Sequence, residues 1–177
     1  MSVSILNALR SQTLSETEFK NPGEVLSALN GAFPGEKHND MFFTIWYGVY
    51  TKSTRTLNYA SGGHPPALLF SASKKQRFEM IPLRTKNNVI GAMPNVTYHN
   101  KKQLIQANSN LFIFSDGVYE HRKADGSMWQ LDEFSDFMFN LSTKSRSRLQ
   151  RLHSYAKDLC VEKNFEDDFT ILEVAFG

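Results

Sequence analysis

Three strand-like runs lie close together between residues 42 and 72, and this cluster most limits the folds open to the chain. The runs cover 42–51, 55–61 and 67–72. In the first run the residues alternate between two faces, and large apolar side chains such as Phe43 and Trp46 occur on both. A strand that is apolar on both faces is covered on both sides. We therefore expect layers of sheet and helix around it.

Helical patterns flank these strands. Helical spacing is already present at Met1 with no capping residue ahead of it, so the chain begins either inside an element or with a frayed helix. A second helix is expected after Asn21, with Glu24 placed to complete a capping box. Further helices are expected at 131–141 and 147–162. Further strands are expected at 77–83, 102–107, 110–115 and 169–176, with residues 108–110 forming a hairpin turn.

This order of elements predicts an α+β fold that places helices on antiparallel sheets, in a single domain spanning residues 1–177. The net charge is +2, and the basic residues of segment 143–151 are too few for a nucleic-acid surface. Cys160 is the only cysteine, which fits a reducing compartment, and it falls on the apolar face of a predicted helix. We expect no membrane span, no signal peptide and a cytoplasmic location.

Carboxylates occur at the ends of two predicted strands. Asp116 and Gly117 follow the apolar run at 111–114 with one residue between, and Asp167 and Asp168 precede the last strand. Each pair has an ordinary explanation, because Asp-Gly forms turns and acidic residues often flank strands. The alternative is a shared site at one edge of a sheet, where clustered carboxylates repel one another unless a hard cation such as Mg²⁺ or Mn²⁺ binds them. In that case Asp116 and Asp167 approach each other.

The histidines occur singly, without the spacing of a metal motif. His64 lies between Gly-Gly and Pro-Pro, so we expect it to serve a turn, while His121 follows the Asp116 turn and is expected to be exposed. The sequence contains no nucleophile elbow and no phosphate-binding loop. The sequence therefore predicts no catalytic residue.

Six segments, in order along the chain, resemble the PPM-type metal-dependent protein serine/threonine phosphatases, and within them the SpoIIE/RsbU branch. LFIFSDGVYE at 111–120 is similar to the strand–Asp–Gly motif, and DDFTILEV at 167–174 to the terminal motif. TRTLNYASGGHPPALLF at 54–70 and VIGAMPNVTY at 89–98 resemble segments typical of the branch. The helical segments at 5–14 and 21–30 resemble the pair that follows the second motif of the branch.

The resemblance implies a layered α-β-β-α sandwich of two antiparallel sheets. It implies that Asp116 and Asp167 are metal ligands, that Gly117 and Asp168 support them, and that a complete domain binds two Mg²⁺ or Mn²⁺ ions. The implied reaction is hydrolysis of phosphoserine or phosphothreonine without a phosphoenzyme. The implied partner is a phosphoprotein such as an anti-sigma-factor antagonist, and an upstream sensor or regulatory domain is possible in this branch.

The chain departs from the branch in one respect. The Gly-Asp-x-x-Asp and Asp-x-x-Gly-His-Gly motifs that open the domain are absent, so the resemblance implies a C-terminal portion that is incomplete at the N-terminus and weak or inactive alone. A noncatalytic pseudophosphatase or protein-interaction module is the alternative, and an unrelated α+β binding domain is a third interpretation.

Overall fold

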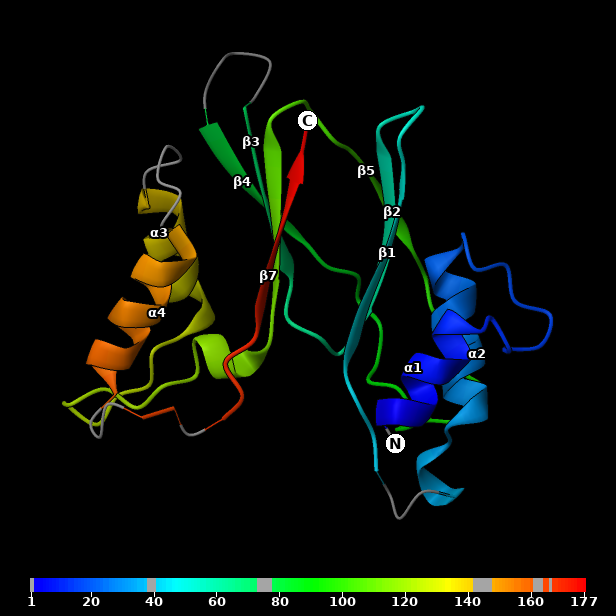
Figure 1. The fold of residues 1–177 in the computed structure, drawn as a ribbon. Coiled ribbons are helices and arrows are strands. Elements are labelled where there is room, and N and C mark those ends of the chain that lie inside the picture. Colours follow the sequence, from blue (N-terminus) through cyan, green and yellow to red (C-terminus); the bar gives the residue numbers. More distant parts are fainter. Residues whose placement is uncertain (1, 38–40, 73–77, 142–147, 161–163, 166) are drawn as a thin grey trace. The chain divides into compact units, whose positions relative to one another are not determined.

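The computed structural model describes residues 2–37, 41–72, 78–141, 148–160, 164–165 and 167–177 (Figure 1). In this described part, four α-helices accompany two antiparallel sheets, with strand orders β1-β2-β5 and β4-β3-β6-β7. The predicted α+β class is confirmed. The chain divides into two compact units, one comprising Met1–Ala67, Pro82–Ala107 and Phe176, the other Leu68–Ile81, Asn108–Ala175 and Gly177. The expectation of a single domain stays a prediction.

The first unit combines two helices with the three-stranded sheet. The helices are α1 (Ser2–Arg10) and α2 (Pro22–Ala32), and the strands are β1 (Ile45–Thr51), β2 (Thr56–Gly62) and β5 (Lys101–Leu104). One face of α2 supplies Val25, Leu26 and Leu29, which are fully buried, and they pack with Ala60 of β2 and with Tyr98. The second helix expected after Asn21 is confirmed, and it buries one face.

Two local expectations for this unit are wrong. Asn21 precedes α2 but makes no side-chain capping bond, because its amide donates instead to Glu24 at 2.7 Å. Glu24 does reach back, but it accepts the backbone N–H of Glu18 at 3.1 Å. The first strand begins at Ile45 rather than at residue 42, and Phe42 is 63% exposed, so apolar character alone placed the start of the strand too early.

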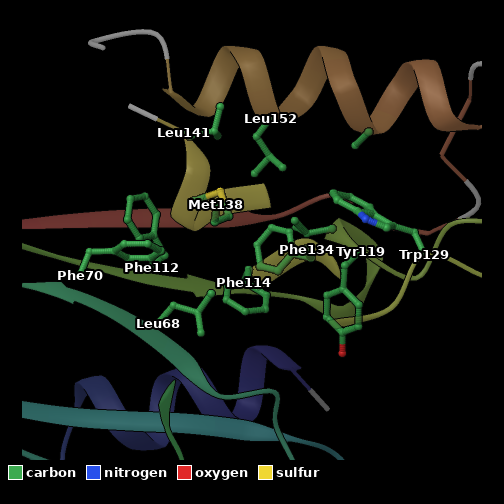
Figure 2. Packing of buried hydrophobic residues seen from close by; sticks show 12 residues of the cluster. Leu68, Phe70, Phe112, Phe114, Tyr119, Trp129, Phe134, Met138, Leu141 and Leu152 are labelled. Carbon is green, nitrogen blue, oxygen red and sulfur yellow. The ribbon is translucent and has the colours of Figure 1, made fainter. Parts of the chain in front are cut away.

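The second unit packs two helices against the four-stranded sheet. Its strands are β3 (Ala67–Ala72), β4 (Phe78–Leu83), β6 (Ser109–Phe114) and β7 (Ile171–Phe176), and its helices are α3 (Leu131–Asn140) and α4 (Arg148–Leu159). Figure 2 shows the core between them. The helices contribute Phe134, Met138, Leu152 and Ala156, and the strands contribute Leu68, Phe70, Phe112 and Phe114. Cys160 is buried, as expected. Residues 142–147 and 161–163, which include parts of the predicted helix at 147–162 and of the basic segment, lie outside the described residues.

The hairpin expected around residues 108–110 does not form. β5 pairs with β2 in one sheet, whereas β6 pairs with β3 in the other. Asn108 has a φ of 60°, so the segment does turn the chain, but it leads from one sheet to the next. Short spacing between two strands favours a hairpin, and here long-range pairing with β2 and β3 outweighs it. No helix in the described part of the chain is long and apolar enough to cross a membrane.

Candidate metal site

Asp116 stands where β6 leaves the core of the second unit. The strand is held by buried Leu111, Phe112 and Phe114, and it runs through Ser115 into a single 3₁₀ turn, η2 (Asp116–Val118). The carbonyl oxygen of Asp116 accepts the N–H groups of Tyr119 and Glu120, each at 2.9 Å. These bonds fix the backbone of the turn and leave the Asp116 side chain exposed.

Ser115 joins this turn to the segment before β7. Its N–H donates to the carbonyl of Thr170 at 3.0 Å, which continues the pairing of β6 beyond the end of the strand. Its hydroxyl donates to the carbonyl of Asp168 at 2.7 Å and accepts the N–H of Thr170 at 3.2 Å. One side chain thereby fastens the Asp116 turn to the Asp167–Asp168 turn.

Gly117 allows the two turns to touch. A Cβ atom at this position would lie 2.6 Å from the carbonyl oxygen of Asp168 and 3.3 Å from the carbonyl carbon of Asp167. Gly117 does not have a positive φ, so the usual role of glycine in an Asp-Gly turn does not apply here. Its lack of a side chain matters because another backbone occupies the space where one would stand.

The structure therefore brings the four predicted site residues into neighbouring turns. Asp167 is exposed, and its Oδ1 accepts the N–H of Asp168 at 2.7 Å. The Oδ1 atom of Asp116 accepts the N–H of Gly117 at 3.1 Å. Exposed carboxylate oxygens are suitable ligands for Mg²⁺ or Mn²⁺, which keep several waters. Among the described residues, however, no three His, Cys, Asp or Glu side chains are grouped closely enough to enclose an ion.

The Asp116 turn carries a buried phenol. Burial raises the pKa of Tyr119 to about 12, and the negative charges of Glu120 and Asp116 contribute further. Tyr119 packs edge-on against Phe114, with ring centroids 6.0 Å apart. Figure 2 shows its hydroxyl oxygen pointing away from the other labelled side chains of the cluster.

The two histidines considered in the sequence, His64 and His121, lie in different environments. His64 lies in the connection between β2 and β3, half-buried, with its Nδ1 atom 2.9 Å from the carbonyl oxygen of Pro65. His121 is only 1% exposed, so the expectation that it lies on the surface is wrong. Its ring stacks with Trp129, Phe165 and Phe169, which come from separate parts of the sequence. Residues following a turn are usually solvated, and only the tertiary packing of these rings buries this one.

Sequence reasoning missed two contributors to the site. Ser115 immediately precedes the predicted ligand, and its position at the end of a strand could have suggested a hydroxyl that bonds to the neighbouring chain. The aromatic pair Phe165 and Phe169 brackets Asp167 and Asp168, with ring centroids 4.6 Å apart. Phe165 and Phe169 are four positions apart, and this spacing is as typical of a strand as of a turn in which the two rings stack.

The chain is similar to known phosphatases and to solved phosphatase domains. The phosphoserine phosphatase RsbU of Bacillus subtilis is 24% identical over 152 residues, covering 86% of this chain and 44% of RsbU. The SpoIIE phosphatase domain with a fragment of its regulatory domain, also from B. subtilis, superposes with a TM-score of 0.73 at 15% identity, covering 98% of this chain and 48% of that chain. The catalytic domain of the phosphatase PstP, solved with two manganese ions, has a TM-score of 0.56 at 13% identity, covering 98% and 79%.

The fold is therefore that of a PP2C-type phosphatase domain. The sequence model of the family described as Stage II sporulation protein E (SpoIIE) matches residues 1–177. The chain belongs to the SpoIIE family. It spans less than half the length of RsbU.

Proposed function

We propose that this chain is part of a metal-dependent phosphatase that hydrolyses phosphoserine or phosphothreonine on a regulatory protein. The observation that carries the proposal is the contact between the two aspartate turns. Ser115 bonds to Asp168, and Gly117 approaches the same backbone so closely that no side chain fits between them. A cation bound between these two turns would offset the repulsion of their carboxylates.

In this proposal Asp116 and Asp167 supply ligand oxygens for Mg²⁺ or Mn²⁺. Such ions, when bound, acidify water and bind phosphate oxygens. Gly117 keeps the two backbones in contact, and Asp168 donates its N–H to Asp167 and so orients that carboxylate. The PstP domain solved with two manganese ions supports a divalent metal, and two ions are proposed for a complete domain.

The proposed substrate is a small phosphoprotein, such as an anti-sigma-factor antagonist, in a partner-switching circuit. The relative RsbU is named a phosphoserine phosphatase, which supports a phosphoserine ester as the substrate. A solved chain that contains both RsbU and RsbW domains, from Mycobacterium tuberculosis, supports the circuit. We propose that the protein acts in the cytoplasm, with a sensor or regulatory domain upstream of this region.

A noncatalytic module is the second candidate. The described residues hold no group of three metal-binding side chains, and the chain lacks the motifs that open the phosphatase domain. A fold that has kept two acidic turns without a full ligand set could bind a partner protein without turnover.

Binding of Mn²⁺ to the 177-residue chain tests the proposal, with free Mn²⁺ measured by electron paramagnetic resonance. We expect weak binding that Asp116→Asn and Asp167→Asn each abolish, while both variants fold as the wild type does. The matched control is Asp132→Asn, which removes an exposed carboxylate from α3 and should bind as the wild type does. Equal binding by all four proteins would favour the noncatalytic module.

A further inference from the structure

His121 connects the two acidic turns through a stack of aromatic rings. It follows Asp116 by five residues, and its ring lies 5.1 Å from that of Phe165 and 6.4 Å from that of Phe169, with the second pair inclined by only 3°. The two phenylalanines bracket Asp167 and Asp168 in the sequence. A residue from the first turn therefore packs on the rings at both ends of the second.

Backbone hydrogen bonds with Tyr119 and Trp129 hold His121 in place. Its N–H donates to the carbonyl of Tyr119 at 2.8 Å, and its carbonyl accepts the N–H of Trp129, also at 2.8 Å. A short hairpin lies between His121 and Trp129, closed by a bridge between Arg122 and Met128. The ring of Trp129 lies 6.3 Å from that of His121 and is nearly parallel to it. The stack thus continues into the buried core, to which Trp129 belongs.

We propose that His121 is a positioning residue, which holds the rings of Phe165 and Phe169 and with them the carboxylate of Asp167 at a fixed place relative to Asp116. This role rests on the metal site proposed above. Ser115 and Gly117 join the backbones of the two turns, whereas the His121 stack restrains the far side of the Asp167 turn. An exposed turn restrained at only one point can rotate its side chains, and a metal ligand must be held within about 0.5 Å of its productive position.

The alternative is that His121 fills space in the core and has no effect on the site. Two substitutions separate these roles. His121→Leu introduces an apolar side chain of similar size without a planar ring, and His121→Phe keeps a ring that can stack. If His121 only fills space, both leucine and phenylalanine replace it without a loss of Mn²⁺ affinity. If His121 positions the Asp167 turn, only phenylalanine does.

The experiment measures Mn²⁺ binding and thermal unfolding on the 177-residue chain. We expect His121→Leu to bind Mn²⁺ about tenfold more weakly, as is typical when an outer partner of a metal ligand is lost, and His121→Phe to restore most of the affinity. Phe165→Leu breaks the same stack from a partly exposed position and should show a similar loss, which keeps the test valid if His121→Leu does not fold. The control is His99→Ala, because His99 is exposed and belongs to the first unit; this variant should bind Mn²⁺ as the wild type does.

The outcomes distinguish the two proposals. Wild-type affinity in His121→Leu and Phe165→Leu would overturn the positioning role while leaving the metal site intact. Losses in His99→Ala and His121→Phe equal to that in His121→Leu would do the same. If the wild-type chain shows no Mn²⁺ binding that depends on Asp116, the metal site fails and the role of His121 fails with it.

Discussion

The hydroxyl of Ser115 donates to the carbonyl oxygen of Asp168 at 2.7 Å, across 53 positions of the sequence. The hydroxyl oxygen of Ser115 also accepts the N–H of Thr170 at 3.2 Å, so Ser115 continues the contact between the two chain segments past the end of β6. The consequence is that Asp116 and Asp167, each exposed to solvent, extend from turns whose backbones cannot move independently.

Substitution of Ser115 by alanine tests this connection. Ser115→Ala removes the hydroxyl that bonds to Asp168 and Thr170, and we expect a loss of about 0.5–1.5 kcal/mol in the free energy of unfolding for each bond that water does not replace. Hydrogen exchange at the N–H of Thr170 should accelerate more than exchange in the strand β6, since the hydroxyl is its acceptor. Ser115→Thr retains the hydroxyl and is the control. Unchanged exchange at Thr170 in the alanine variant would contradict the connection.

Substitution of Gly117 by alanine tests the close approach of the two turns. The added Cβ atom would lie 2.6 Å from the Asp168 carbonyl oxygen, so the backbones must separate. We expect a destabilisation of about 1–3 kcal/mol, measured by denaturant unfolding, together with weaker binding of Mn²⁺. The matched control is Gly31→Ala in α2, where nothing lies within 4 Å of the added atom. That variant should gain about 0.5–1 kcal/mol from helix propensity. A Gly117→Ala protein as stable as the wild type would show that the turns separate freely.

The raised pKa of Tyr119 predicts a loss of protein stability at high pH. Its pKa is raised from 10.0 to about 12, chiefly by burial. The unfolded state therefore loses this proton before the folded state does, so the stabilisation is complete below pH 10 and is lost as the pH rises to about 12. Unfolding measured across this window should show the wild type losing up to about 2 kcal/mol more than Tyr119→Phe, which has no phenol to titrate. Parallel curves for the two proteins would show that Tyr119 titrates normally.

The fourth prediction concerns turnover by the chain of 177 residues. We expect weak or no release of phosphate from a phosphoserine protein, even with millimolar Mn²⁺, because the chain lacks the Gly-Asp-x-x-Asp motif and so the aspartate that resemblance assigns to bridging two ions. Two ions must be held ~3.5–4 Å apart for in-line displacement. An extended chain that supplies this motif should release phosphate in a metal-dependent manner, and Asp116→Ala or Asp167→Ala should abolish that release.

Two results would change this interpretation. Vigorous Mn²⁺-dependent release by the short chain would show that the metal site lies elsewhere. No release by the extended chain, despite a normal fold, would favour the noncatalytic module.

Periodicity of apolar residues predicted most of the secondary structure. The expected strand at 67–72 coincides with β3, and the apolar faces of the second and third helices supply the buried residues Leu29 and Phe134. These elements are predictable because an amphipathic segment must bury one face wherever the chain takes it. Helix α1 is less predictable, since Val3 shares the helical spacing but is 72% exposed while Ile5 is buried.

Strand pairing was not predictable in the same way. Residues 108–110 have the length and composition of a hairpin turn, yet β5 and β6 pair with strands some forty residues earlier in the chain. Local sequence sets the conformation of each segment, whereas the choice of partner depends on contacts that exist only when the sheets assemble. The same reason explains why the hydrogen bond from Ser115 to Asp168 was missed.

The sequence by itself determined the order of the elements, membership of the SpoIIE family and the acidic residues at two strand ends. Only the tertiary structure decided that Gly117 lies against the backbone of Asp168 and that His121 is buried among aromatic rings. The physical reason is that a carboxylate or a glycine is visible in its own segment, whereas burial and close approach are properties of two segments distant in sequence.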